Sequence, residues 1–167
     1  MTARLAQIWR HPVKGIGREP LDAVTLNADA PMPGDRAWAF QHEGAPDEPG
    51  WQPRRNFLVV ANGPKLAQVT AKTEEAGRIA LSHPDRPALS FAPETEGAAL
   101  AEWVRPLWPE TAPAPRALVK APPQGMGDNG AAEVSILSLS SLRDLSERIG
   151  KPLELGRFRG DLVLDDH

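Results

Sequence analysis

Cysteine is absent from this 167-residue sequence. Without it the chain can form no disulfide, offer no thiolate to a metal and use no cysteine nucleophile. An excess of positive charge is also missing, because the formal net charge is −3. The charge balance therefore favours neither nucleic acid nor an anionic membrane as a partner. No apolar run approaches the roughly 20 residues of a spanning helix, and residues 1–10 show no signal-peptide pattern, so we expect a cytoplasmic protein.

Recognisable catalytic patterns are missing as well. The four histidines are scattered and lack the H-x-x-x-H spacing of a zinc site: His11, His42, His83 and His167. We therefore predict no metal site from the residues. The serines of "SILSLSS" at 135–141 lie outside a G-x-S-x-G nucleophile elbow, which gives a serine hydrolase little support.

Many short apolar runs separated by turns are present. The 18 prolines and 14 glycines are dispersed among these runs, which is typical of short strands joined by turns. We expect strands near residues 5–10, 21–28, 36–40, 56–60, 65–72, 77–82, 88–92, 133–138 and 157–166. With helices near 95–108 and 140–150, the sequence predicts an α+β fold: a mainly antiparallel, barrel-like sheet with two or more short helices.

The second expected helix has clear local signals. Gly150 suits its C-terminal end, and Ser140 or Ser141 can cap its start. Its apolar residues lie at helical spacing and predict a buried stripe made of Leu142, Leu145 and Ile149.

Basic residues recur at turns and strand ends. They are Lys14, Arg36, the pair Arg54 and Arg55, and Arg157 with Arg159. Singly, each is also explained as a solvated charge or, for Arg36, as the partner of Asp35. Together they would suit an anionic ligand, because guanidinium groups bind phosphate through two hydrogen bonds.

Several motifs in order resemble the MOSC family, named after the C-terminal domain of molybdenum cofactor sulfurase. "HPVKG" followed by "GDRAWAF" is similar to the family's N-terminal β-barrel segment, and "WQPRRNFL" to its later glutamine and arginine stretch. "ILSLSSL" and "RFRGD" are similar to the opening of the MOSC domain proper. The resemblance implies an N-terminal barrel segment at 1–120 and the start of the MOSC domain at 121–167, within one compact unit.

The resemblance also implies a ligand. MOSC proteins that bind the molybdopterin form of the molybdenum cofactor contact it through the P-V-K lysine, the G-D-R arginine and the arginine of R-F-R. These positions are Lys14, Arg36 and Arg159. The polar loop at Asp128 and Asn129 lies near the family's cofactor loop, and Asp161 stands where the family has an asparagine. Family association alone adds pyridoxal phosphate binding.

Two departures from the family pattern stand out. Asp161 gives up the amide donors of asparagine and adds negative charge near the expected anion site. The family continues past the equivalent of His167 with more strands and the cysteine that ligates molybdenum or carries sulfur. Ending a barrel at "DLVLDD" predicts an open edge at "LVL" (162–164), which fits a sequence that stops early, a split gene, or a small domain closed by another chain.

Three functions remain in competition. The first is a molybdenum-cofactor protein related to oxidoreductases that reduce N-hydroxylated compounds and to sulfur carriers, with a redox partner protein. The second is a non-catalytic pterin- or anion-binding module, because the chain lacks the metal-ligating cysteine. The third is an unrelated barrel in which the motif residues lie far apart. In each case we expect this chain alone to be inactive in sulfur-ligated molybdenum chemistry.

Overall fold

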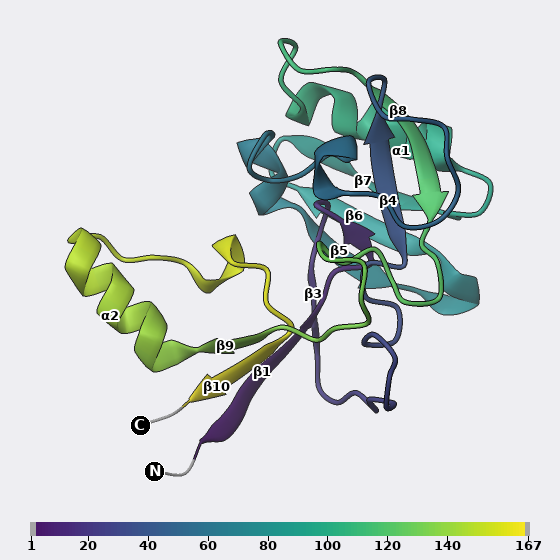
Figure 1. The fold of residues 1–167 in the computed structure, drawn as a ribbon. Helices are drawn as coiled ribbons and strands as arrows, with labels where there is room; N and C mark the ends of the chain where they lie inside the picture. The colour runs from purple at the N-terminus through teal and green to yellow at the C-terminus, as the bar shows by residue number, and fades with distance from the viewer. Residues whose placement is uncertain (1–2, 166–167) are drawn as a thin grey trace.

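The computed structural model describes residues 3–165, in which ten strands and two α-helices form a mixed α+β fold (Figure 1). The strands divide into three hydrogen-bonded sheets, one of four strands and two of three. Most strand pairs are antiparallel, as expected. The strands lie in three sheets rather than the expected single barrel-like sheet, and no ladder closes the sheets of the described residues into a barrel.

The four-stranded sheet brings both ends of the described chain together (Figure 1). Its strand order is β3 (Glu19–Leu21), β1 (Arg4–Arg10), β10 (Leu162–Asp165) and β9 (Ile136–Ser138). β10 pairs antiparallel with β1 and parallel with β9. The expected open edge at residues 162–164 is therefore wrong, because both sides of β10 are paired and the edge falls at β9.

The other two sheets enclose the main core. One contains β2 (Val13–Lys14), β4 (Trp38–His42) and β8 (Pro115–Lys120), with β2 parallel to β4. The other is the antiparallel meander β5 (Thr70–Thr73), β6 (Ile79–His83) and β7 (Arg86–Phe91). Phe40 of β4 and Phe91 of β7 are fully buried in the same apolar cluster.

Helix α1 (Gly97–Val104) covers this core. It packs against β7 and β8, and its buried side chains are those that the 3.6-residue period predicts: Leu100, Trp103 and Val104. Pro106 lies in a 3₁₀ turn, Arg105–Leu107, which follows the helix directly. A proline inside a helix removes a backbone donor, and the α-helix accordingly ends just before Pro106.

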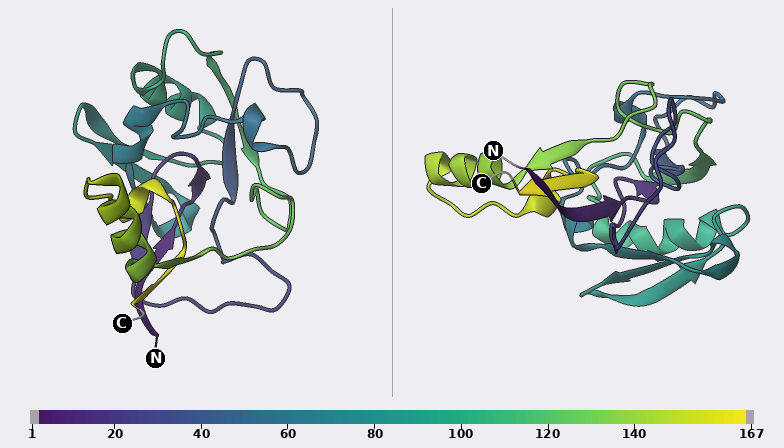
Figure 2. Two further views of the ribbon diagram at one scale, coloured as in Figure 1. Left: turned by 60° about the vertical axis from the view of Figure 1, so that its left-hand side comes forward. Right: turned by 90° about the horizontal axis from the view of Figure 1, so that it is seen from below.

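Helix α2 (Leu139–Ile149) is confirmed, but its packing is not. Gly150 ends it in the left-handed conformation with φ 70°. Ser138, rather than the expected Ser140 or Ser141, caps its start by accepting a hydrogen bond from the Ser141 N–H. All eleven residues of α2 are described, and none is buried; Leu145 is 37% exposed and Ile149 is 51% exposed. The predicted buried stripe is wrong because α2 packs mainly against the short strands β9 and β10, at one end of the molecule (Figure 2).

Several expected strands are shorter than predicted or absent, among them 65–72, where a 3₁₀ helix, Pro64–Gln68, precedes β5, and 133–138 and 157–166, which contain only β9 and β10. β3 ends at Leu21, and β4 begins only at Trp38 because Arg36 adopts a left-handed φ of 45°. Residues 56–60 form no strand; Phe57 makes one isolated bridge, yet it is fully buried. A short apolar run does not reveal whether its backbone is paired in a sheet.

Among residues 3–165, no helix has the length and apolar character needed to span a bilayer.

Candidate functional site

A tight turn presents Lys14. The Ile16 N–H donates to the Val13 carbonyl at 3.0 Å, and Gly15 has a φ of 78°. A Cβ at position 15 would lie 2.1 Å from the Leu58 carbonyl oxygen. Only glycine fits both the conformation and the close approach. The sequence "PVKG" thus folds locally into a rigid turn that holds the start of the lysine side chain.

The Lys14 ammonium is buried and already has partners. Its Nζ donates to the Met126 carbonyl at 2.8 Å and to Asp128 Oδ1 at 2.5 Å. It also lies 6.0 Å from the centroid of the Phe57 ring. Burial lowers the pKa of Lys14, and the contact with Asp128 only partly opposes this shift. The lysine therefore ties its turn to the loop after β8, the loop in which the sequence predicted Asp128 to be near the ligand.

Arg36 is held between two carboxylates. Its backbone N–H donates to the His11 carbonyl at 2.7 Å. Its Nη1 donates to Asp35 and, at 2.9 Å, to Asp161 Oδ1, while Nη2 donates to the Arg159 carbonyl at 2.8 Å. Burial would lower the pKa of Arg36, but the two carboxylates outweigh it and raise that pKa. The pairing of Arg36 with Asp35 that the sequence allowed is therefore present.

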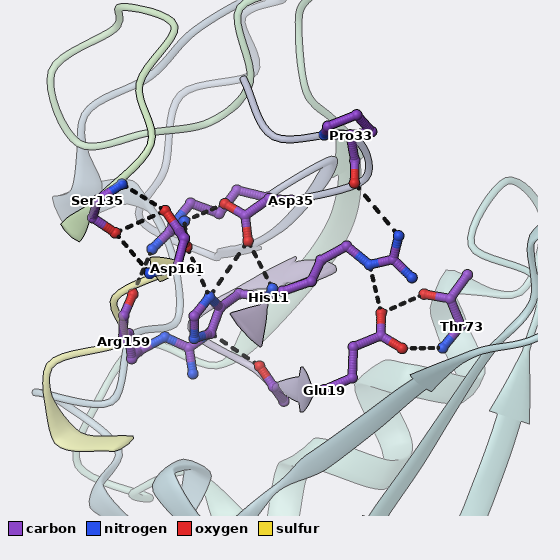
Figure 3. A network of polar contacts seen from close by, with 11 residues as sticks. His11, Glu19, Pro33, Asp35, Thr73, Ser135, Arg159 and Asp161 are labelled. Carbon is purple, nitrogen blue, oxygen red and sulfur yellow. Dashed lines mark hydrogen bonds and ion pairs between the residues drawn. The ribbon is translucent and has the colours of Figure 1, made fainter. Parts of the chain in front are cut away.

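Asp161 is the internal counter-ion of this site (Figure 3). It is 1% exposed, and its Oδ2 accepts from the Ser135 N–H at 2.8 Å and the Ser135 Oγ–H at 2.7 Å. Burial would raise the pKa of Asp161, but His11, Arg36 and the Ser135 donors hold it well below its ordinary value. The aspartate in place of the family's asparagine thus neutralises Arg36, and both of its oxygens are occupied within the chain.

His11 and Asp35 complete the cluster, and sequence reasoning missed their role. The His11 N–H donates to Asp35 Oδ1 at 2.7 Å, and His11 Nδ1 lies 3.4 Å from Asp35 Oδ1 and 3.3 Å from Asp161 Oδ1. Ligand atoms of the three side chains lie within 4.8 Å of one another, as in a metal site. Arg36 already supplies positive charge to both carboxylates, so we assign the cluster to holding the site together. The only sequence signal was their position inside the "HPVK" and "GDR" motifs.

Arg159 differs from the other two motif cations because it forms no ion pair with a carboxylate of the described residues. It adopts a left-handed φ of 50°, and its Nη2 donates to the Gly17 carbonyl at 3.1 Å. Among residues 3–165 no ion pair with a carboxylate compensates it. Burial, and then the nearby Arg36, lower the pKa of Arg159 to about 10. The guanidinium is still charged at neutral pH and is only partly neutralised by its surroundings.

One cleft of about 880 Å³ is lined by Lys14, Arg36 and Arg159, together with Asp128 and Asp161. Its basic residues are Lys14, Arg18, Arg36, Arg54, Arg157 and Arg159. Its acidic residues are Asp128, Glu133, Glu154 and Asp161. The predicted convergence of Lys14, Arg36 and Arg159 is thus observed, and basic residues outnumber acidic ones in the described lining.

Asn129, one of the expected site residues, and Gln52 of the "WQPRRNFL" stretch are not in the described cleft lining. Asn129 turns into its own loop, where it donates to Glu133 Oε2 at 2.7 Å and accepts from the Ala131 N–H at 2.9 Å. Gln52 of "WQPRRNFL" is buried, and its Oε1 accepts from Gln41 at 3.0 Å and from Asn56 at 3.1 Å. Both support loops that carry neighbouring cleft residues.

The motif order and this geometry agree with a comparison against known families. The model described as the MOSC N-terminal beta barrel domain matches residues 2–107. The chain belongs to this MOSC family. No curated protein and no solved structure matches the chain. The matched range includes Lys14 and Arg36, whereas Asp128, Arg159 and Asp161 lie beyond it.

Proposed function

We propose that the cleft of this MOSC-family chain binds an anionic, phosphate-bearing pterin, the organic part of the molybdenum cofactor. The observation that carries the proposal is the Arg159 guanidinium, which lies in the cleft wall beside Arg36 and has no carboxylate partner among the described residues. A partly buried cation without a counter-ion is costly, and a ligand phosphate supplies the missing charge and hydrogen-bond acceptors.

Backbone strain at the same place supports the proposal. In the described part of the chain, four residues other than glycine have a positive φ, and two of them are Arg36 and Arg159. A left-handed conformation costs an ordinary residue about 1–2 kcal/mol. Such strain persists where the surroundings impose it, and it concentrates at binding sites.

The residues present fit the pterin phosphate better than the metal. Phosphate recognition needs positive charge and N–H donors, which the cleft offers. A thiolate for molybdenum is absent, since the sequence has no cysteine. Met32 and Met126 are buried and offer only neutral thioethers. Bound molybdenum supplies two-electron chemistry, while the residues of this chain bind and orient the organic ligand.

The three motif cations have distinct parts in this proposal. Arg159 holds the phosphate directly. Lys14 exchanges the exposed carboxylate of Asp128 for a ligand oxygen, since Asp128 is 62% exposed and can move into water. Arg36 keeps its ion pairs with Asp35 and Asp161 and so holds the cleft wall in place. We further propose that residues 121–167 are the start of the MOSC domain and that a complete protein reduces N-hydroxylated compounds or carries sulfur.

A second candidate is a non-catalytic module that binds the same ligand. The absence of cysteine favours it, because this chain would then retain or transfer the pterin without holding the metal through sulfur. The two candidates differ in turnover. Reduction of an N-hydroxylated compound by the purified 167-residue chain, supplied with cofactor and reductant, would exclude the module.

Calorimetric titration with a phosphorylated pterin and with its dephosphorylated form tests the shared binding step. We expect the phosphorylated form to bind more tightly, and added salt to weaken it. Arg159→Gln should weaken binding about tenfold or more, since a hydrogen bond to a charged group contributes roughly 1.5–3 kcal/mol. Arg148→Gln on α2, which is not in the described cleft lining, is the matched control. Equal affinity for both pterins would refute the phosphate site.

A further inference from the structure

Arg18 is a second uncompensated arginine in the cleft. It follows the turn that carries Lys14, and its guanidinium carbon lies 5.0 Å from the centroid of the Trp9 ring. This cation–π contact fixes the side chain without neutralising it. Within residues 3–165 no carboxylate forms an ion pair with Arg18. Its charge therefore remains available to a ligand.

Gly156 makes room for this guanidinium. A Cβ at position 156 would lie 1.5 Å from Arg18 Nη1 and 2.2 Å from Arg18 Cζ. Gly156 lies in the 3₁₀ turn Leu155–Arg157 and does not have a positive φ. Its backbone therefore accepts alanine, and the steric conflict would fall on the flexible end of Arg18. Glycine at this position keeps the guanidinium close to the backbone of the opposite wall.

Arg18 and Arg159 are anchored to the same short segment. Arg159 Nη2 donates to the carbonyl of Gly17, the residue before Arg18. Both side chains line the cleft, and the positive charge of Arg18 lowers the pKa of Arg159, after the larger effects of burial and Arg36. Two like charges held this way repel each other, and no carboxylate of the described chain lies between them as an ion-pair partner. An anion that contacts both guanidinium groups would relieve the repulsion.

We propose that Arg18 and Arg159 form a clamp for a tetrahedral dianion, with Gly156 as the notch that positions Arg18. This inference rests on the proposed function, since it places the ligand phosphate against these two residues. Two guanidinium groups match the double charge of a phosphate monoester and offer paired N–H donors to its oxygens. The dianion is preferred over the monoanion.

Calorimetric titration of the full 167-residue chain with inorganic phosphate, and separately with a phosphorylated pterin, tests the clamp. The variants are Arg18→Gln, which removes the positive charge, and Gly156→Ala, which displaces the Arg18 side chain but leaves its charge in place. Arg148→Gln on α2 is the control, and circular dichroism establishes that each variant is folded. We expect both cleft variants to raise the Kd about tenfold for either probe. Wild-type affinity for phosphate should also rise from pH 5.5 to pH 8 as the dianion forms.

The outcomes separate the clamp from the proposed function. If the wild type binds phosphorylated pterin but neither Arg18→Gln nor Gly156→Ala weakens it, the clamp is wrong and the pterin site stands. If phosphate alone binds and depends on Arg18, but the pterin adds no affinity, the clamp serves free phosphate and the pterin proposal is wrong. If the wild type binds neither probe, both are wrong.

Discussion

Asp161→Asn removes one buried negative charge and keeps the shape of the side chain. In the native site one carboxylate oxygen accepts from Arg36 at 2.9 Å, and the other accepts from the Ser135 N–H at 2.8 Å. An amide has one oxygen. If it faces Ser135, the NH₂ group meets the guanidinium; if it faces Arg36, the NH₂ group meets the Ser135 N–H.

The loss of stability in Asp161→Asn can be estimated from these contacts. Losing a hydrogen bond to a charged group costs roughly 1.5–3 kcal/mol, and removing one partner of a fully buried ion pair roughly 3–5 kcal/mol. The Arg36 side chain is 21% exposed, so water compensates part of the loss. We therefore expect Asp161→Asn to lower the free energy of unfolding by about 2–4 kcal/mol at pH 7.

The effect should depend on pH in a defined direction. The pKa of Asp161 is lower in the folded chain than in the unfolded chain. Its stabilisation is therefore complete well above the unfolded value of about 3.9, and it is lost as the pH falls below that value. The difference between wild type and variant should narrow below about pH 4.

Urea denaturation at several pH values measures both effects. Asp128→Asn is the matched control, because it makes the same chemical change at a carboxylate that is 62% exposed. We expect the control to change stability by less than about 1 kcal/mol. A cost below about 0.5 kcal/mol for Asp161→Asn, or a cost that stays constant from pH 7 to pH 3, would refute the role of Asp161 as a buried counter-ion.

Three further predictions use the same preparations. Leu145→Ala should cost less than about 1 kcal/mol in urea, because Leu145 is 37% exposed, whereas Leu100→Ala in the core should cost about 2–5 kcal/mol; equal costs would show that α2 is covered in solution. Gly15→Ala should lower the melting temperature by at least about 4 °C, because φ is 78° and a carbonyl blocks the Cβ; an unchanged melting temperature would mean that the turn can rearrange. Asp128→Asn should tighten phosphate binding about threefold by freeing Lys14, as a partly exposed ion pair contributes up to about 1 kcal/mol; an unchanged Kd would show that Lys14 does not contact the anion.

Local signals predicted the elements that local interactions determine. The strands near 77–82 and 88–92 and both α-helices follow from periodicity and turn residues. The buried face of α1 was also predictable, because this helix packs on the core through one stripe. The exposed face of α2 was not, since the pattern of apolar residues does not reveal how much neighbouring structure covers them.

The pairing of strands that are distant in the chain could not be predicted from the sequence. The insertion of β10 between β1 and β9 joins segments from opposite ends of the chain, and periodicity carries no information on partners. For the candidate site, too, the motifs predicted some features and the fold determined the others. The motifs predicted that Lys14, Arg36 and Arg159 would lie together, but the roles of His11 and Asp161 depend on distances that only the fold provides.

The pairing of β1 with β10 has a consequence for how the protein is made. Arg4 pairs with Asp165, so the ribosome must synthesise nearly the whole described chain before this ladder can form. At roughly 5–20 residues per second, β1 waits on the order of ten seconds with one side unpaired. β3 can pair with the other side almost at once, since it follows within a few residues.

During that interval Arg36 also lacks Asp161, because the aspartate belongs to the last segment made. The cleft is therefore among the last parts of the molecule to form, although two of its motif cations are synthesised first. Mutations in residues 159–165 should slow the acquisition of ligand binding more than the folding of the α1 core, because the core does not wait for the C-terminal strand.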